Sequence, residues 1–208
     1  FELMFVRPLL LSALLATGSI AEMEPQCQCS EIKPCVEAAG GTVHSCADRC
    51  QKYFIAMGAQ WRAAKQCILA HEERILAAGE CAHKSFGQIC ATSPGFLVPK
   101  RYTGTIELAA YTEISAMLKR SGVFLEGKQM IKAGSKGVGC MSKCVARSSC
   151  AKLNCGIALP SDNVIVSNVK SCAIRAGFTT PIIRQVCQCL ASAGVLQLAN
   201  VCERLTVT

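Results

Sequence analysis

Apolar positions recur along most of this chain with the period of an α-helix. In "TVHSCADRCQKYFIAMG", residues 42–58, they are spaced by three and four and fall on one helical face. These positions are Val43, Cys46, Ala47, Cys50, Phe54 and Met57. Thr42 is a suitable helix cap, and Gly58 is a suitable end signal. The pattern therefore predicts a helix between these two residues.

The rest of the chain is read in the same way and yields further helices but hardly any strand-like alternation. The predicted segments are 59–79, a short helix holding Cys81, Phe86 and Cys90, 105–122, a weaker helix at 123–134, 163–177 and 179–194. A loop, "SKGVG", is expected at 135–139. In the last helix Thr180 is the expected cap and Pro181 occupies the first helical position, where proline is favoured. We therefore predict an all-α protein, a disulfide-stapled helical bundle.

Residues 1–21 have the features of a secretory signal. Arg7 precedes an apolar run from Leu9 to Ala16, and small residues lead to a cleavage position after Ala21. The run is too short to span a bilayer, which needs roughly 20 apolar residues. The sequence thus predicts secretion into the extracellular space, without a transmembrane segment.

Secretion changes how the 16 cysteines are interpreted, because an oxidising compartment favours disulfides. An even count favours complete pairing into eight bridges over free thiols or a metal site. The candidate disulfide residues are Cys27, Cys29, Cys35, Cys46, Cys50, Cys67, Cys81, Cys90, Cys140, Cys144, Cys150, Cys155, Cys172, Cys187, Cys189 and Cys202.

The spacing of the cysteines limits their partners. Cys187 and Cys189 lie about 200° apart on a helix of 100° per residue, so we expect each to bond a different neighbour. Cysteines four residues apart share a helical face. Cys46 with Cys50, and Cys140 with Cys144, are therefore each expected to bond one helix to its neighbours at two positions along its axis. Cys27 and Cys29 are expected to tie down an extended N-terminal strap in two directions.

Eight cysteines precede a 49-residue gap and eight follow it. Equal intervals from Cys50 to Cys67 and from Cys155 to Cys172 favour an internal duplication over chance. The predicted division is a first cysteine-rich helical module at 22–98, a basic cysteine-free connector at 99–139, and a second module at 140–208. Most bridges are expected within each half.

The net charge of +8 is concentrated near the connector. Residues 99–152 carry 10 basic and 3 acidic side chains, while residues 22–98 carry 7 basic and 8 acidic ones. Clustered charge raises the local concentration of an oppositely charged polymer, although a solvated connector is the simpler interpretation. The candidate glycan-binding residues are Lys128, Lys132, Lys136, Lys143, Arg147 and Lys152.

Catalytic signals are weak. The three histidines are His44, His71 and His83, for which we expect surface or structural roles; His71, in "LAHEERI", looks like part of a solvated helix face. The sequence contains neither a G-x-S-x-G elbow nor an H-E-x-x-H metal motif. We therefore expect no enzyme activity, no cofactor and no metal.

The C-terminal run at 148–205 carries C-A-x-x-x-C-G, then L-P-x-D-N, a cysteine before A-I-x-x-G-F, C-x-C, A-G-V and a last cysteine. The pattern uses Cys150, Cys155, Gly156, Leu159 to Asn163, Cys172, Gly177, Phe178, Cys187, Cys189, Gly194, Val195 and Cys202. This run resembles the cysteine-rich domain of nematode chondroitin proteoglycan 4-type secreted proteins. The resemblance implies a non-catalytic matrix or eggshell-type protein that carries or contacts chondroitin.

The leading functional expectation is a secreted structural or interaction protein, with acidic polysaccharide or another extracellular protein as partner and no nucleic acid. The alternative is a carrier of a lipid or small apolar ligand, since stapled helices can surround an apolar cavity. An effector or inhibitor is a third class. An enclosed apolar cavity would favour the carrier.

Overall fold

The computed structural model describes residues 22–150 and 153–207. The predicted signal segment, residues 1–21, and Lys152 lie outside the described residues. The described part is all-α apart from one small sheet, as the sequence predicts. Its helices are α1 (Cys29–Ile55), α2 (Trp61–Leu69), α3 (Glu72–Ser85), α4 (Thr103–Arg120), α5 (Phe124–Ser149), α6 (Asp162–Arg175) and α7 (Thr180–Ser192).

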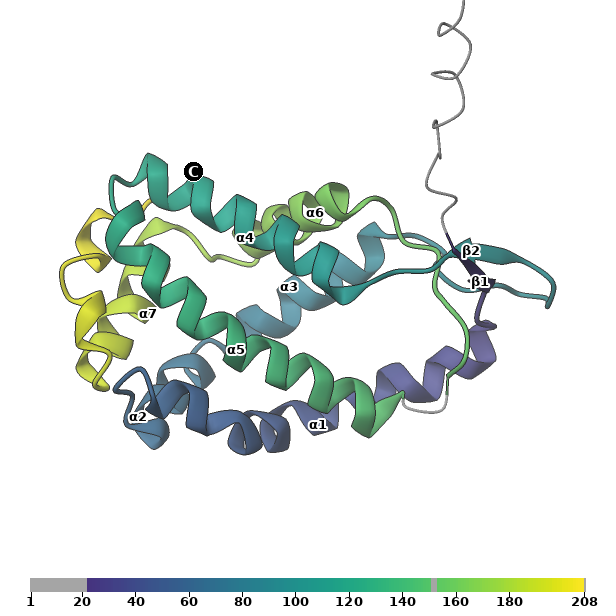
Figure 1. The fold of residues 1–208 in the computed structure, drawn as a ribbon, viewed down its shortest axis with the longest axis horizontal. Coiled ribbons are helices and arrows are strands. Elements are labelled where there is room, and N and C mark those ends of the chain that lie inside the picture. Colours follow the sequence, from purple (N-terminus) through teal and green to yellow (C-terminus); the bar gives the residue numbers. More distant parts are fainter. Residues whose placement is uncertain (1–21, 151–152, 208) are drawn as a thin grey trace, which may run out of the picture.

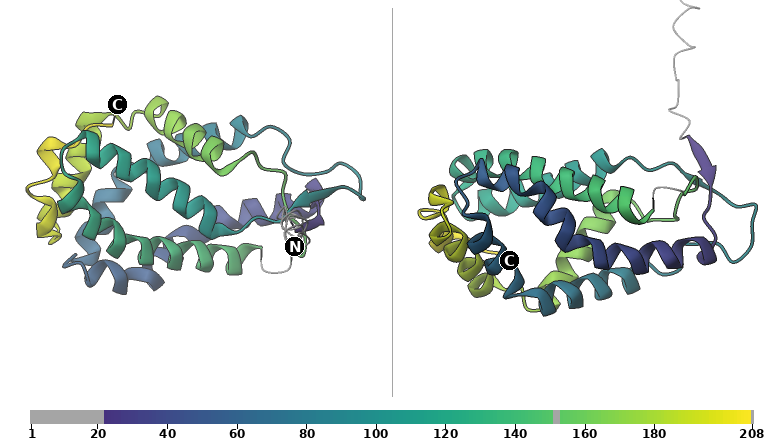
Figure 2. Two further views of the ribbon diagram at one scale, coloured as in Figure 1. Left: turned by 45° about the horizontal axis from the view of Figure 1, so that its top comes forward. Right: turned by 90° about the horizontal axis from the view of Figure 1, so that it is seen from below.

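The helices form an elongated bundle (Figure 1). Helix α1 packs along α5, α5 packs against α4, and α4 packs against α6, which also lies on α3. Helix α2 contacts α7, which together with the short 3-10 turns Leu196–Leu198 and Cys202–Arg204 forms one end of the molecule (Figure 2). No helix in the described ranges combines the length and apolar character needed to cross a membrane.

The opposite end is closed by two short antiparallel strands, β1 (Met23–Pro25) and β2 (Leu97–Pro99). Helix α1 follows β1 almost at once and begins at Cys29, so the predicted start at Thr42 is wrong. The backbone N–H of Gln28 donates to the Glu31 carboxylate at 2.7 Å, which satisfies a donor that a helix N-terminus leaves unpaired. Only Cys27 therefore lies in an extended strap, because Cys29 is already helical.

Three other predictions of secondary structure are corrected. The short helix expected to hold Cys81, Phe86 and Cys90 does not form separately, because Cys81 lies in α3, which ends at Ser85. The predicted helix at 59–79 is broken between α2 and α3, where His71 is only 8% exposed and lies near the Phe178 ring, so it is not on a solvated face. The predicted loop at 135–139 is instead part of α5. A Cβ at Gly137 would lie 2.9 Å from the Phe54 ring, so glycine permits close packing of α5 on α1 there.

Every cysteine is paired, which confirms the expected eight bridges. The bonds are Cys27–Cys155, Cys29–Cys90, Cys35–Cys150, Cys46–Cys144, Cys50–Cys140, Cys67–Cys189, Cys81–Cys172 and Cys187–Cys202. As expected, the members of each C-x-C pair have different partners.

The expectation that most bridges lie within each half is wrong. Only Cys29–Cys90 and Cys187–Cys202 do so, and the other bonds cross between the halves. The reason is that α1 from the first half lies antiparallel on α5, which places two four-residue cysteine spacings opposite each other. The proposed boundary between residues 139 and 140 also falls inside α5.

Apolar packing is concentrated at the α7 end. One cluster contains Leu118, Val123, Val201 and Leu205 around the Cys187–Cys202 bridge. A second cluster is made mostly of small side chains and includes Ala64, Cys67 and Ala193. Of the largest fully buried side chains, all but Val123 are half-cystines. Disulfides therefore take the place of large aliphatic side chains over much of the interior.

The ends of α1 and α7 meet through two glycines. Gly58 and Gly194 have φ angles of +94° and +107°, and a Cβ on Gly194 would lie 2.3 Å from the Gly58 carbonyl oxygen. The adjacent Gln60 N–H donates to the Ala193 carbonyl at 2.7 Å. This contact allows no side chain on either glycine.

We predict that Gly194→Ala lowers the free energy of unfolding by about 2 kcal/mol or more, since it combines a left-handed backbone with a backbone clash. Chemical denaturation measures the change. Gly79→Ala is the control, because it lies in α3 with nothing within 4 Å of the new Cβ, and it should be neutral or slightly stabilising. Equal stabilities of the two variants would contradict the predicted contact.

One ion pair links α4 to α6. Lys170 Nζ donates to Glu113 Oε1 at 2.6 Å, and Arg120 Nη2 lies 3.8 Å from the same oxygen. The hydrogen bond from Lys170 lowers the pKa of Glu113 below its usual 4.5, with Coulombic attraction to Lys170 and Arg120 acting in the same direction. A carboxyl group with a lowered pKa stabilises the fold above its unfolded-state pKa, and this contribution is lost as the pH falls through the folded-state pKa.

Glu113→Gln should therefore lower the unfolding free energy near neutral pH, by at most about 1 kcal/mol because the pair is partly exposed. The difference from the parent should disappear as the pH falls through the lowered pKa of Glu113. Denaturation curves across acidic pH test this. A difference that stays constant with pH would mean that Glu113 acts through packing alone.

Candidate functional site

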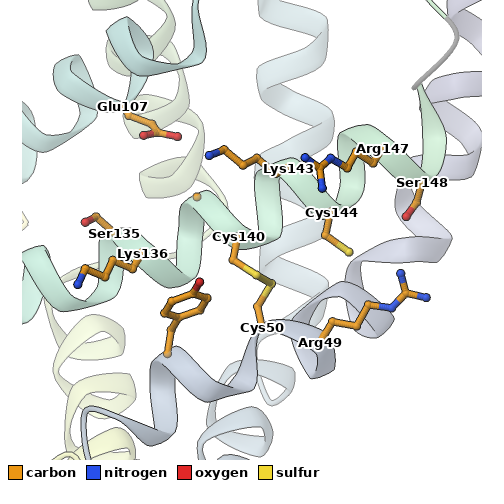
Figure 3. A pocket seen from close by; sticks show the side chains of 12 residues that line it. Arg49, Cys50, Glu107, Ser135, Lys136, Cys140, Lys143, Cys144, Arg147 and Ser148 are labelled. Atoms are coloured by element: carbon orange, nitrogen blue, oxygen red, sulfur yellow. A yellow bond between two sulfur atoms is a disulfide. The ribbon is translucent and has the colours of Figure 1, made fainter.

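The candidate site is a groove on the outer face of the α1–α5 pair. The bridges Cys46–Cys144 and Cys50–Cys140 join these helices at two positions one helical turn apart, with Cα–Cα distances of 5.6 and 5.9 Å. Two covalent ties of this kind prevent the helices from sliding or rotating past each other. The side chains beside the bridges are therefore presented in a fixed arrangement (Figure 3).

Basic side chains from both helices line this groove, which has a volume of about 660 Å³. Arg49 reaches it from α1, while Lys136, Lys143 and Arg147 reach it from α5 (Figure 3). Glu107 from α4 is the acidic residue in the lining, and Lys143 points toward it (Figure 3). The remaining lining residues are Cys50, Tyr53, Ser135, Gly139, Cys140, Cys144 and Ser148.

Helical geometry explains why the basic residues of α5 gather on one face. At 100° per residue, the positions of Lys128, Lys132, Lys136, Lys143 and Arg147 fall within an arc of about 100°. All five side chains are exposed. The opposite face of α5 is occupied, because Gly137 abuts the Phe54 ring of α1. We call these five residues the basic face of α5.

The charges of this face are not neutralised within the described part of the chain. None of its five cations forms an ion pair there, whereas Lys65, Lys170 and Arg204 are paired with Asp48, Glu113 and Glu126. The groove lining carries four cations and one carboxylate. An excess of unpaired positive charge on a rigid surface favours binding of an anion with several charges, which can contact several cations at once.

The structure brings together part of the predicted binding set. Lys136, Lys143 and Arg147 line the groove, and Lys128 and Lys132 continue the same face toward the start of α5. Lys152 lies outside the described residues. Sequence reasoning missed Arg49, which comes from the other half of the chain. Its position could be found only by knowing that the adjacent Cys50 is bonded to Cys140.

The histidines lie apart from this groove. His44 Nε2 lies 3.0 Å from the Glu72 carboxylate, and His71 Nδ1 lies 3.2 Å from Arg74 Nη1. Cys81, two residues before His83, is bonded to Cys172 and is therefore no metal ligand. No group of three or more histidine, cysteine, aspartate or glutamate side chains within 22–150 and 153–207 is placed to hold a metal ion.

No protein-family model, curated protein or solved structure matches this chain. The resemblance of residues 148–205 to nematode chondroitin proteoglycan 4-type domains therefore remains a prediction from the sequence.

Proposed function

We propose that this protein is a secreted, non-enzymatic structural or interaction protein that binds an acidic polysaccharide along the basic face of α5. The observation that carries the proposal is the row of unpaired cations on a helix fixed by two disulfides. Eight disulfides support an extracellular location, because such bonds persist in oxidising compartments.

A linear polymer suits this face better than a small anion does. From Lys128 to Arg147 the face extends about 28 Å at 1.5 Å per residue. A small anion could contact only the cations nearest to it, whereas a chain of repeating sulfates or carboxylates could contact the whole row. Arg49 widens the row where α1 lies beside α5. The acidic glycan implied by the resemblance has this repeating charge.

The expected affinity is modest and sensitive to salt. An exposed ion pair contributes about 0–1 kcal/mol, so measurable binding needs several pairs on one polymer. Fixing α5 reduces the entropy lost when those pairs form. With a Debye length of about 8 Å at physiological ionic strength, added salt should weaken the attraction steeply.

The test is retention on immobilised chondroitin sulfate or heparin across a salt gradient. The groove variant carries Lys136→Gln, Lys143→Gln and Arg147→Gln. Its control carries Arg62→Gln, Lys84→Gln and Arg175→Gln, which remove the same charge from exposed positions on α2, α3 and α6. We expect the groove variant to elute earlier, with affinity weaker by up to about two orders of magnitude, and the control to elute near the parent.

Glu107→Gln should delay elution, because it removes the carboxylate that lines the groove. Two results would contradict the proposal. Elution of the parent at or below physiological salt would show that the face has no useful affinity. Equal shifts of the groove variant and the control would show that only net charge matters.

A further inference from the structure

A second, chemically different cavity lies on the inner side of the same helices. It has a volume of about 390 Å³ and is lined by α1, α2, α3, α5, α7 and the turn after α7. Its wall is almost entirely apolar, including Phe54, Trp61, Met130, Met141, Leu190 and Leu198. The volume lies within the range of small-molecule sites, roughly 300–1,000 Å³.

The apolar lining is open to water where α1, α2 and α3 meet. Ile68 and Ile75 are each 43% exposed, and Leu76 is 65% exposed, although all three line the cavity. Adjacent exposed aliphatic side chains of this kind mark a binding surface, unlike apolar residues scattered singly. At the α7 end the lining is buried, since Ala64 and Val195 are each at most 6% exposed. The cavity is therefore a pocket with an apolar mouth and a closed end.

The charged and imidazole side chains beside this pocket form two hydrogen-bonded groups. Lys65 Nζ donates to both Asp48 carboxylate oxygens at 2.9 Å, and Trp61 Nε1 donates to one of them at the same distance. His44 Nε2 lies 3.0 Å from Glu72 Oε1. These groups comprise one lysine, two carboxylates and the imidazole of His44. Among the described lining residues, no cation remains without a carboxylate partner.

We infer that this pocket binds an uncharged apolar ligand, specifically a single-chain amphiphile with a hydroxyl head group such as a fatty alcohol or a monoacylglycerol. The chain would fill space that water occupies poorly, because water in such a cavity finds few hydrogen-bond partners. Met57, Met130 and Met141 provide flexible, polarisable contacts that adapt to a chain of variable shape.

The ion pairs determine the choice of head group. A carboxylate or phosphate at the pocket would face the Glu72 carboxylate, and the lining lysine, Lys65, is already paired with Asp48. A hydroxyl can instead donate to the Glu72 carboxylate or share a hydrogen bond with His44. The pocket is therefore expected to prefer an alcohol over the fatty acid of equal length, in contrast to the basic face of α5, which attracts anions.

The test uses N-phenyl-1-naphthylamine, an uncharged dye that fluoresces in apolar sites, with the full disulfide-bonded protein at neutral pH. We expect saturable binding, and displacement of the dye by dodecanol at lower concentration than by dodecanoate. Leu76→Glu should weaken dye binding roughly tenfold or more, since it places a charge at the mouth. Leu108→Glu is the matched control, because Leu108 is also 65% exposed but lies on α4 outside the pocket, and it should change nothing.

Three results would overturn the inference. The absence of saturable dye binding would mean that the pocket takes no apolar ligand. Equal loss in both glutamate variants would place the dye elsewhere on the surface. Displacement by dodecanoate at the same or lower concentration than by dodecanol would contradict the head-group assignment. The groove variant should bind the dye as the parent does, so failure of glycan binding and failure of this inference are separable.

Discussion

The covalent attachment of α1 to α5 is the constraint on which the rest of the structure depends. Cys46 and Cys50 are fully buried against Cys144 and Cys140, and half-cystines predominate among the largest fully buried side chains. Along this helix pair, sulfur takes the place that large aliphatic residues occupy in most helical bundles. The fold can therefore keep many apolar side chains exposed, because cross-links limit the freedom of its unfolded chain.

The same helix pair organises both proposed binding surfaces. On α5, the basic residues from Lys128 to Arg147 occupy one face, while Met130 and Met141 project from the other into the apolar pocket. On α1, Arg49 lines the groove and Phe54 lines the pocket. Charged and apolar chemistry are thus separated by one layer of helix. Because the two disulfides fix the rotation of each helix, the basic face and the apolar pocket stay on different sides of the helix pair.

The sequence pattern was sufficient to predict the helical class, the helices near α4, α6 and α7, and complete pairing of the cysteines. It was also sufficient for the different partners of Cys187 and Cys189, since helical rotation alone separates them. The pattern wrongly predicted a loop at residues 135–139, where α5 is continuous. Glycines weaken the local helix propensity there, but α1 packs closely on Gly137. The place of Arg49 in the groove and the lining of the apolar pocket could not be predicted, because both require knowing which distant helices are neighbours.

The pairing between halves was not predictable from the spacing of the cysteines. Cys67 on α2 is bonded to Cys189 on α7, and Cys172 on α6 is bonded to Cys81 on α3. In the predicted duplication, Cys172 corresponds to Cys67, so these two counterparts are each bonded to the other half of the chain. The duplication stays a prediction, but these bonds explain why the halves cannot be separate modules.

The register of the α1–α5 bridges is tested most directly by tryptic mapping without reduction. Trypsin can cleave after Arg49 and after Lys143, and so can separate the two bridges into different peptides. We expect "CQK", residues 50–52, to be bonded to "GVGCMSK", residues 137–143, through Cys50–Cys140. We expect "CVAR", residues 144–147, to be bonded to the peptide that contains Cys46. Recovery of "CQK" joined to "CVAR", or to any peptide from the first half, would contradict this pairing.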